Sequence, residues 1–155
     1  MNVPRSKDRV RISDENTSVL ESLGENTDAA GVFRNQAKAV AFAATVGYHF
    51  HKFEPVSGQT SKAILFQQID QATDLGGDLL AVFALAHTGD IAVLAPKDFE
   101  DDSDSPDPVL IFEGYVNGGL TYIRKQGFDP AQPINTVRSL ARTLDLATSD
   151  VFSRE

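Results

Sequence analysis

The sequence of 155 residues has no cysteine, no tryptophan and a single methionine. The absence of cysteine excludes a disulfide scaffold, a thiolate nucleophile, an iron–sulfur cluster and a cysteine-ligated zinc site. The longest apolar stretches, such as residues 39–46, fall far short of the roughly 20 residues that a bilayer span needs. The first residues also lack the apolar core of a signal peptide. We therefore expect a cytoplasmic protein that makes no membrane contact.

The negative charge of the chain comes mainly from one segment. The sequence has 22 acidic and 14 basic residues, for a formal charge of −8. Residues 96–108 contain three prolines and six acids, a composition that cannot bury apolar area and predicts a mobile loop. The rest of the chain is close to neutral, which argues against a freestanding protein that coats DNA. The six acids are Asp98, Glu100, Asp101, Asp102, Asp104 and Asp107.

Basic residues dominate the beginning of the chain. Residues 1–12 are predicted to form an extended arm, of which residues 10–12 could pair as a strand. The only acid of the arm is Asp8, and its cations are Arg5, Lys7, Arg9 and Arg11. Clustered cations of this kind can contact DNA or an acidic partner. A disordered, solubilising terminus is the alternative interpretation.

Apolar residues recur at helical spacing along most of the remaining chain. We predict a mainly α protein: a compact, single-domain bundle of five or six helices, to which a short β-hairpin or isolated strands could be added. The helical domain is expected at residues 13–146, followed by a frayed tail at residues 147–155. The expected helices span residues 13–23, 35–46, 61–72, 79–87, 108–125 and 134–144.

Cap residues and glycines set the expected ends of these helices. Asn35 is a favoured N-cap residue, and Asp107 with a proline directly after it is typical of another helix start. Gly24 and Gly47 are expected to end their helices. After Gly47, the alternating sequence YHFHKF favours a short strand or an extended exit.

Three of the segments need a closer interpretation. Residues 61–72 are ambiguous, because the AILF run suits a strand while the apolar spacing fits a helix, which we favour. Residues 79–87 are predicted to be a buried helix, since their small and large apolar residues suit close helix packing. In residues 108–125 one apolar stripe continues across two adjacent glycines, which cost about 2 kcal/mol relative to alanine and so indicate a close backbone approach or a kink. The stripe consists of Phe112, Val116, Leu120 and Ile123.

Four further cations lie in the last two predicted helices. They could form a second basic patch if these helices run antiparallel, although ordinary solvated faces are the alternative. They are Arg124, Lys125, Arg138 and Arg142.

The sequence carries little evidence of catalysis. His49 and His51 would point the same way from an extended segment, as a metal pair could, but no third ligand stands at metal-site spacing. Structural or surface roles are the alternative for both histidines. The acidic segment lacks the residue order of a calcium loop, no serine lies in a G-x-S-x-G turn, and neither glycine pair fits a phosphate-binding loop. We expect no enzyme, no metal site and no cofactor.

Three stretches taken together resemble a known family. They are AVAFAATVGY at residues 39–48, LLAVFALAHTGDIAVL at 79–94 and IFEGYVNGGLTYI at 111–123. Over residues 10–125 their order and spacing are similar to the Dnd system-associated protein four family, also called DNA phosphorothioation-associated protein four. The resemblance implies a place beside bacterial systems that replace a non-bridging phosphate oxygen of DNA with sulfur and restrict unmodified DNA. It implies no catalytic residues.

The most specific part of the resemblance is EGYVNGGL, where the family pattern would be E-x-Y-A-N-G-G-L and Val116 replaces the alanine. Glu113 and Asn117 lie one helical turn apart and off the apolar stripe. Tyr115 offers an aromatic body with a hydroxyl, and the glycines let another backbone come close. The motif is either a partner-docking surface or internal packing in which Asn117 satisfies freed carbonyls. The partner-binding candidates are Glu113, Tyr115, Asn117, Gly118 and Gly119.

Three functions stay open at this point. The resemblance favours an accessory, non-catalytic protein of a bacterial DNA phosphorothioation-linked restriction or antiviral defence system, acting through contacts with other proteins of that system. A DNA-contacting regulator is the alternative, and it would use the basic N-terminal arm. A cryptic hydrolase built on His49, His51 and a carboxylate is the third hypothesis.

Overall fold

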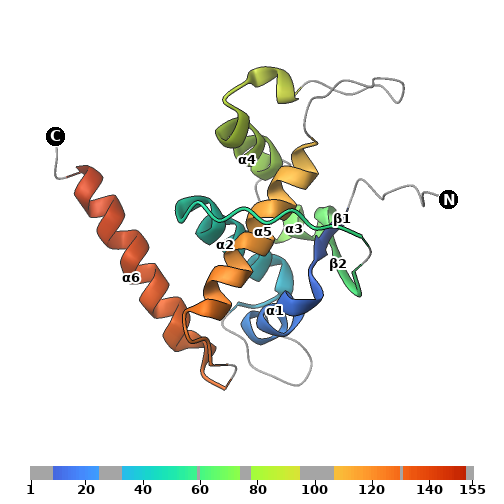
Figure 1. Ribbon diagram of the computed structural model, residues 1–155. Coiled ribbons are helices and arrows are strands. Elements are labelled where there is room, and N and C mark those ends of the chain that lie inside the picture. Colours follow the sequence, from blue (N-terminus) through green and yellow to red (C-terminus); the bar gives the residue numbers. More distant parts are fainter. Residues whose placement is uncertain are drawn as a thin grey trace.

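The computed structural model describes residues 9–24, 33–58, 60–73, 78–94, 107–129 and 131–152. Within these ranges the protein is mainly helical, as predicted, and one long helix occupies the centre (Figure 1). The α-helices are α1 (Thr17–Leu23), α2 (Gln36–His49), α3 (Phe66–Thr73), α4 (Asp78–Thr88), α5 (Pro108–Lys125) and α6 (Pro133–Phe152). The strands are β1 (Arg9–Ile12) and β2 (Lys62–Leu65), and the 3-10 helices are η1 (Asp14–Asn16) and η2 (Ile91–Leu94).

Helix α5 begins and packs as its sequence predicts. The Asp107 side chain accepts a hydrogen bond from the backbone N–H of Val109 at 2.9 Å, and proline occupies the first turn, where its missing N–H is not needed. Helix α2 crosses α5, and α1, α4 and β1 also contact it (Figure 1). The predicted stripe of α5 is fully buried at Phe112, Val116, Leu120 and Ile123.

Helix α2 is longer than predicted. Its N-cap is as expected, but the helix continues through Gly47 to His49, so the predictions of an end at Gly47 and an extended exit are wrong. The helix ends instead in a Schellman motif, in which Lys52 N–H donates to Gly47 C=O at 2.8 Å and His51 N–H donates to Tyr48 C=O at 3.3 Å. His51 adopts the left-handed conformation, φ 55°, that this motif requires.

The two strands pair although they are far apart in the sequence. Strand β1 runs antiparallel to β2, with Val10 opposite Ile64, and confirms the strand predicted at residues 10–12. Val10, Ile12 and Ile64 are buried, which sets the register because a shift by one residue would expose all three. Residues 61–72 therefore divide into a strand and then helix α3 from Phe66, and the single helix favoured from the sequence is wrong for the first part.

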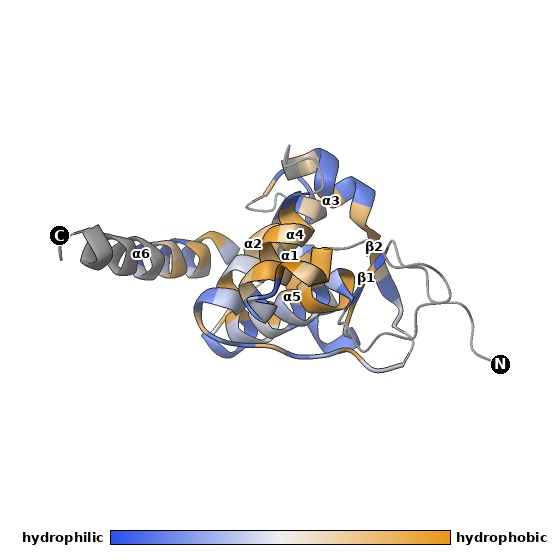
Figure 2. Ribbon diagram, turned by 90° about the horizontal axis from the view of Figure 1, so that it is seen from above, coloured by the Kyte–Doolittle hydropathy of each residue, from blue (hydrophilic) through white to orange (hydrophobic). Residues whose placement is uncertain are grey.

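Helix α6 diverges from the end of α5 and projects from the rest of the molecule (Figures 1 and 2). It continues to Phe152, past the end expected at residue 144. Figure 2 also shows apolar residues gathered where α2, α4 and α5 meet. Arg5, Lys7 and most of the predicted acidic loop lie outside the described residues. Among the described helices, none combines the length and apolarity needed to cross a membrane.

Candidate functional site

A row of polar side chains lies along α5 beside the apolar stripe. Glu113, Asn117 and Thr121 are spaced four residues apart, so successive turns of the helix place them on one face. All three are buried, and Glu113 and Asn117 are each only 1% exposed. Buried polar groups destabilise a protein unless they are hydrogen-bonded, so the partners of this row determine what it does.

Glu113 is paired with Arg11 of β1. The guanidinium donates to the carboxylate at 2.8 Å, and Arg11 N–H donates to the other carboxylate oxygen, also at 2.8 Å. Nε of Arg11 also donates to the Glu113 carboxylate, and the terminal nitrogens donate to the carbonyls of Val56 and Gly58. The hydrogen bond that Arg11 donates to the Glu113 carboxylate raises the pKa of Arg11 above its usual value. This cation of the predicted arm is therefore engaged within the protein, while Arg9 is exposed.

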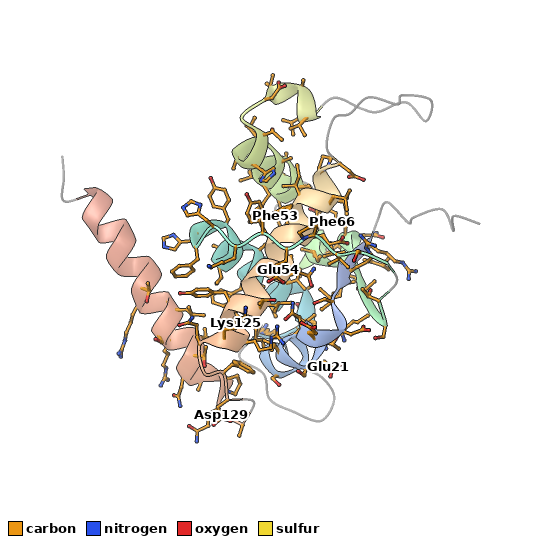
Figure 3. The ribbon with its side chains drawn as sticks, viewed as in Figure 1. Glu21, Phe53, Glu54, Phe66, Lys125 and Asp129 are labelled. Carbon is orange, nitrogen blue, oxygen red and sulfur yellow. The ribbon has the colours of Figure 1, made fainter. Side chains whose placement is uncertain are left out.

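Asn117 fixes the end of β1 and the residue that follows it. Its amide donates to Arg11 C=O and to Glu113 C=O, both at 2.9 Å, and its carbonyl accepts from Ser13 N–H at 2.9 Å. One turn further, the Thr121 hydroxyl donates to the Glu54 carboxylate at 2.7 Å. The polar row thus holds β1 and the segment after α2 against α5. Figure 3 shows Phe53 and Glu54 on that segment where it crosses the helix.

The glycines of the α5 motif allow close backbone contacts. A Cβ on Gly119 would lie 1.8 Å from the Ala43 carbonyl oxygen of α2, and a Cβ on Gly47 would lie 2.1 Å from the Tyr115 carbonyl oxygen. A Cβ on Gly118 would lie 2.0 Å from the Lys52 carbonyl oxygen. The two adjacent glycines therefore allow other backbone segments to approach α5 closely on two sides, and the close backbone approach predicted from the sequence is confirmed.

The five partner-binding candidates are consequently not an exposed docking surface in this structure. The polar members are engaged with β1 and the glycines face other backbone segments, so the internal-packing interpretation describes the motif. The sequence alone could not decide between docking and internal packing, because the partner of Glu113, Arg11, lies far away in the sequence. The candidates that the structure buries are Glu113, Tyr115, Asn117, Gly118 and Gly119.

Tyr115 belongs to an aromatic cluster beside α4. Its hydroxyl lies 2.6 Å from Nδ1 of His87, and burial raises the pKa of Tyr115 above its usual value. The ring packs edge-on against Tyr48 and Phe53, and Phe53 also stacks on His87 with centroids 5.0 Å apart. Because Tyr48, Phe53 and His87 reach the surface, this cluster joins the core to the outside of α4.

The histidine pair does not take the predicted arrangement. His49 is the last residue of α2 and its ring packs edge-on against Phe50, while His51 lies beyond the helix in the left-handed conformation. The two side chains therefore do not project from one side of a strand. In the described part of the chain, no group of three or more histidine, aspartate or glutamate residues is placed to hold a metal ion.

In the described part of the chain, the two most exposed large apolar residues lie on α4 and η2. Helix α4 buries Leu79, Phe83 and Ala84, but its other side faces solvent, so the prediction that this helix is buried holds for one face only. The sequence did contain a sign of this surface, because residues 79–87 are apolar on all sides of a short helix and a second apolar segment follows at residues 91–94. We name the exposed residues the α4–η2 surface: Val82 (61% exposed), Leu85 (41%), Ile91 (76%) and Leu94 (41%).

The cations of α5 and those of α6 do not form one basic patch. Arg124 forms an ion pair with Glu15 at 3.4 Å, and Lys125 is exposed at the end of α5. Arg138 and Arg142 are exposed on α6, which diverges from α5 (Figure 1).

Comparison with known families decides which group of proteins shares this pattern. The family model described as DNA sulphur modification system-associated protein 4 matches residues 9–143. The chain belongs to this family. The match begins at β1 and extends into α6, beyond the residues 10–125 that carried the resemblance. Neither a curated protein nor a solved structure gives a significant match.

Membership of the family associates the chain with a DNA sulphur modification system. The family match includes both partners of the buried ion pair, Arg11 and Glu113, and also the α4–η2 surface. The first of these holds the fold together. Within the described residues nothing covers the α4–η2 surface, so this surface is the candidate interaction site.

Proposed function

We propose that the protein is an accessory, non-catalytic component of a bacterial DNA sulphur modification and restriction system and binds other proteins of that system. The exposed α4–η2 surface is the observation that carries this proposal. Large apolar side chains grouped on a protein surface are typical of protein–protein interaction sites. Family membership supports the choice of partner, because the family is described by its association with such a system. We place this role in the cytoplasm, and in defence against foreign DNA.

The size of the α4–η2 surface suits a reversible complex in which each protein also folds on its own. Full burial of one large aliphatic side chain contributes about 1.5–3 kcal/mol. The four side chains are exposed by between 41% and 76%, so covering them would contribute about 4 kcal/mol before the losses of association are subtracted. Additional polar contacts around the apolar centre would have to supply the rest of the affinity.

The arm-based alternative is less well supported. A cation contributes to DNA binding when it can neutralise a phosphate. Arg11 is occupied by Glu113 and by two backbone carbonyls, so it is withdrawn from that role. The remaining arm cations are Arg5, Lys7 and Arg9.

The proposal is tested by co-purification from a host that carries the modification system. Tagged full-length chain is compared with the variant Val82→Gln/Leu85→Gln and with Ile134→Gln as a matched control, since Ile134 is an exposed large apolar residue on α6. We expect a system protein to co-purify with the wild-type chain and with the control, and its recovery to fall at least tenfold with the α4 variant. Recovery that is equal for all three chains would refute the assignment of this surface.

The non-catalytic part of the proposal needs its own measurement. The purified chain is incubated with unmodified and phosphorothioated DNA, with nucleotide and with a panel of divalent metals. We expect no cleavage of the DNA and no turnover of the nucleotide. Either activity, if lost in His49→Ala/His51→Ala, would favour the hydrolase hypothesis instead.

A further inference from the structure

The elements that carry the α4–η2 surface contain acids but no cation. Asp78 begins α4 and Asp90 directly precedes η2, and both side chains are exposed. In the described part of the chain neither of them forms an ion pair. Residues 78–94 have no lysine or arginine, and residues 107–123, which form most of the α5 helix that α4 contacts, have none either. The exposed apolar side chains are therefore surrounded by negative charge.

The distribution of charge along the sequence strengthens this asymmetry. Residues 78–107 have eight acids and one lysine, so this stretch accounts for −7 of the formal charge of −8. Negative charge of this size repels nucleic acid and anionic lipid, and two copies of the chain meeting at this surface would bring like charges together. A positively charged partner is attracted instead, and its association is accelerated.

The shape of the α4–η2 surface favours a helical partner. Val82 and Leu85 are three positions apart on α4, and Ile91 and Leu94 are three positions apart on the 3-10 helix η2, so each pair lies on one side of its helix. Helices α4 and η2 contact each other, and together they form the upper end of the molecule in Figure 1. Neither of them offers the strand edge that an extended peptide would need, whereas the apolar face of an amphipathic helix packs against such ridges.

We propose that the α4–η2 surface binds a basic amphipathic helix of the partner protein. The apolar face of that helix covers Val82, Leu85, Ile91 and Leu94, and the lysine or arginine residues beside this face lie against Asp78 and Asp90. The inference rests on the function proposed above for the identity of the protein that carries the helix. Apolar burial should then govern the rate of dissociation, and the charges should govern the rate of association and its dependence on salt.

The test measures binding of fluorescein-labelled peptides to the full chain by anisotropy. Each peptide has about 20 residues, which is long enough to form a helix. The basic peptide has leucines at helical spacing on one face and lysine and arginine on the other. The acidic peptide keeps the leucines and has glutamate in place of the cations, and the scrambled peptide has the basic composition without an apolar face. We expect saturable binding of the basic peptide and at least tenfold weaker binding of the other two.

The apolar contacts are tested with the variant Val82→Gln/Leu85→Gln. It should bind the basic peptide at least tenfold more weakly than wild type, because both removed side chains are exposed on α4. Ile134→Gln is the control, since it removes an exposed large apolar residue from α6, and its affinity should stay within threefold of wild type.

The charge contacts are tested with Asp90→Lys and with Asp129→Lys as a matched control. Each aspartate accepts a hydrogen bond at 2.9 Å from the backbone N–H two residues further on, so both variants lose the same local bond and change the net charge equally. Asp90→Lys should weaken binding of the basic peptide by about threefold at low salt, and Asp129→Lys should not. The difference should disappear near 1 M salt, where the Debye length is about 3 Å.

Several results would overturn the proposal. They are no saturable binding of the basic peptide, equal binding of the acidic or scrambled peptide, unchanged binding in Val82→Gln/Leu85→Gln, and equal losses for Asp90→Lys and Asp129→Lys. Sedimentation equilibrium of the chain alone adds a further one. If the chain dimerises and Val82→Gln/Leu85→Gln abolishes the dimer, the occupant is a second copy. Circular dichroism of each variant establishes that it is still folded.

Co-purification separates this inference from the proposed function. If a protein of the modification system is recovered through Val82 and Leu85, but equally well with Asp90→Lys and Asp129→Lys, the proposed function stands and the basic helix is wrong. If the basic peptide binds as expected but no protein of the system co-purifies, the proposed function is wrong and the chemistry assigned to the surface holds.

Discussion

The crossing of α2 and α5 gives the sharpest test of how the fold is built. Replacing Gly119 by alanine would place a Cβ 1.8 Å from the Ala43 carbonyl oxygen, whereas ordinary van der Waals contact begins near 3.4 Å. The obstacle is backbone, so no side chain can turn away to make room. The helices would have to separate by about 1.6 Å at this point.

A separation of that size affects the whole helix–helix interface. A gap of about 0.5–1 Å already removes a quarter to a half of the dispersion energy of each contact, and overpacking of a core typically costs about 1–3 kcal/mol. Helix propensity alone would favour alanine over glycine by about 1 kcal/mol. Because the clash is with backbone, we expect Gly119→Ala to lower the free energy of unfolding by about 3 kcal/mol, which lowers Tm by about 6–12 °C.

The assay is urea and thermal unfolding followed by circular dichroism. Gly89→Ala serves as control, since Gly89 has a left-handed φ of 67° but no atom within 4 Å of an added Cβ. This control should lose only about 1 kcal/mol, from backbone strain. A Gly119→Ala protein as stable as wild type, or more stable as helix propensity alone would require, would refute the close-contact explanation.

Three further predictions concern the polar contacts and the end of α2. Glu113→Ala should lower the free energy of unfolding by about 3 kcal/mol, measured by urea titration, because it removes one partner of a buried ion pair; an effect below about 1 kcal/mol would contradict the structural role. His51→Gly should raise the free energy of unfolding by about 1 kcal/mol in the same assay, since glycine adopts the left-handed conformation without strain; a loss of stability would argue against the Schellman motif. Hydrogen bonds from Ser61 lower the pKa of Asp14. The carboxylate therefore adds stability at neutral pH, and this stability is lost as the pH falls through the folded-state pKa. The pKa of Asp14, followed by carbon-13 NMR, should return toward its usual value in Ser61→Ala.

Local signals in the sequence predicted the starts of α2 and α5 correctly, whereas α1 begins at Thr17, after a 3-10 turn and later than predicted. Asn35 and Asp107 cap α2 and α5 because a side-chain oxygen next to a helical run can reach the free N–H groups whatever the tertiary structure. Gly24 ends α1 as expected. The stripe from Phe112 to Ile123 was equally accessible, since helical spacing depends only on neighbouring residues.

Features that depend on distant residues were not accessible from the sequence. Gly47 was interpreted as a helix end, but it lies inside α2 because the backbone of α5 approaches it there. For Glu113 the sequence left a docking surface and internal packing open, because its partner, Arg11, lies 102 positions away. The pairing of β1 with β2 also joins segments that are distant in the sequence, so the first part of residues 61–72 forms a strand against its helical pattern.

The interaction surface was missed for a different reason. An apolar helix is normally buried on all sides, and nothing in the sequence of α4 distinguishes Val82, which is exposed, from Phe83, which is buried. Only the position of α5 on one side of α4 separates them.

The central claim is that the α4–η2 surface is where this protein meets a partner. Site-specific photo-crosslinking tests it most directly: a photoreactive amino acid is placed at position 82 in cells that carry the modification system, and at position 134 as the comparison. We predict a cross-link from position 82 to a protein of that system and none from position 134. No cross-link from position 82, or the same cross-link from both positions, would contradict the claim.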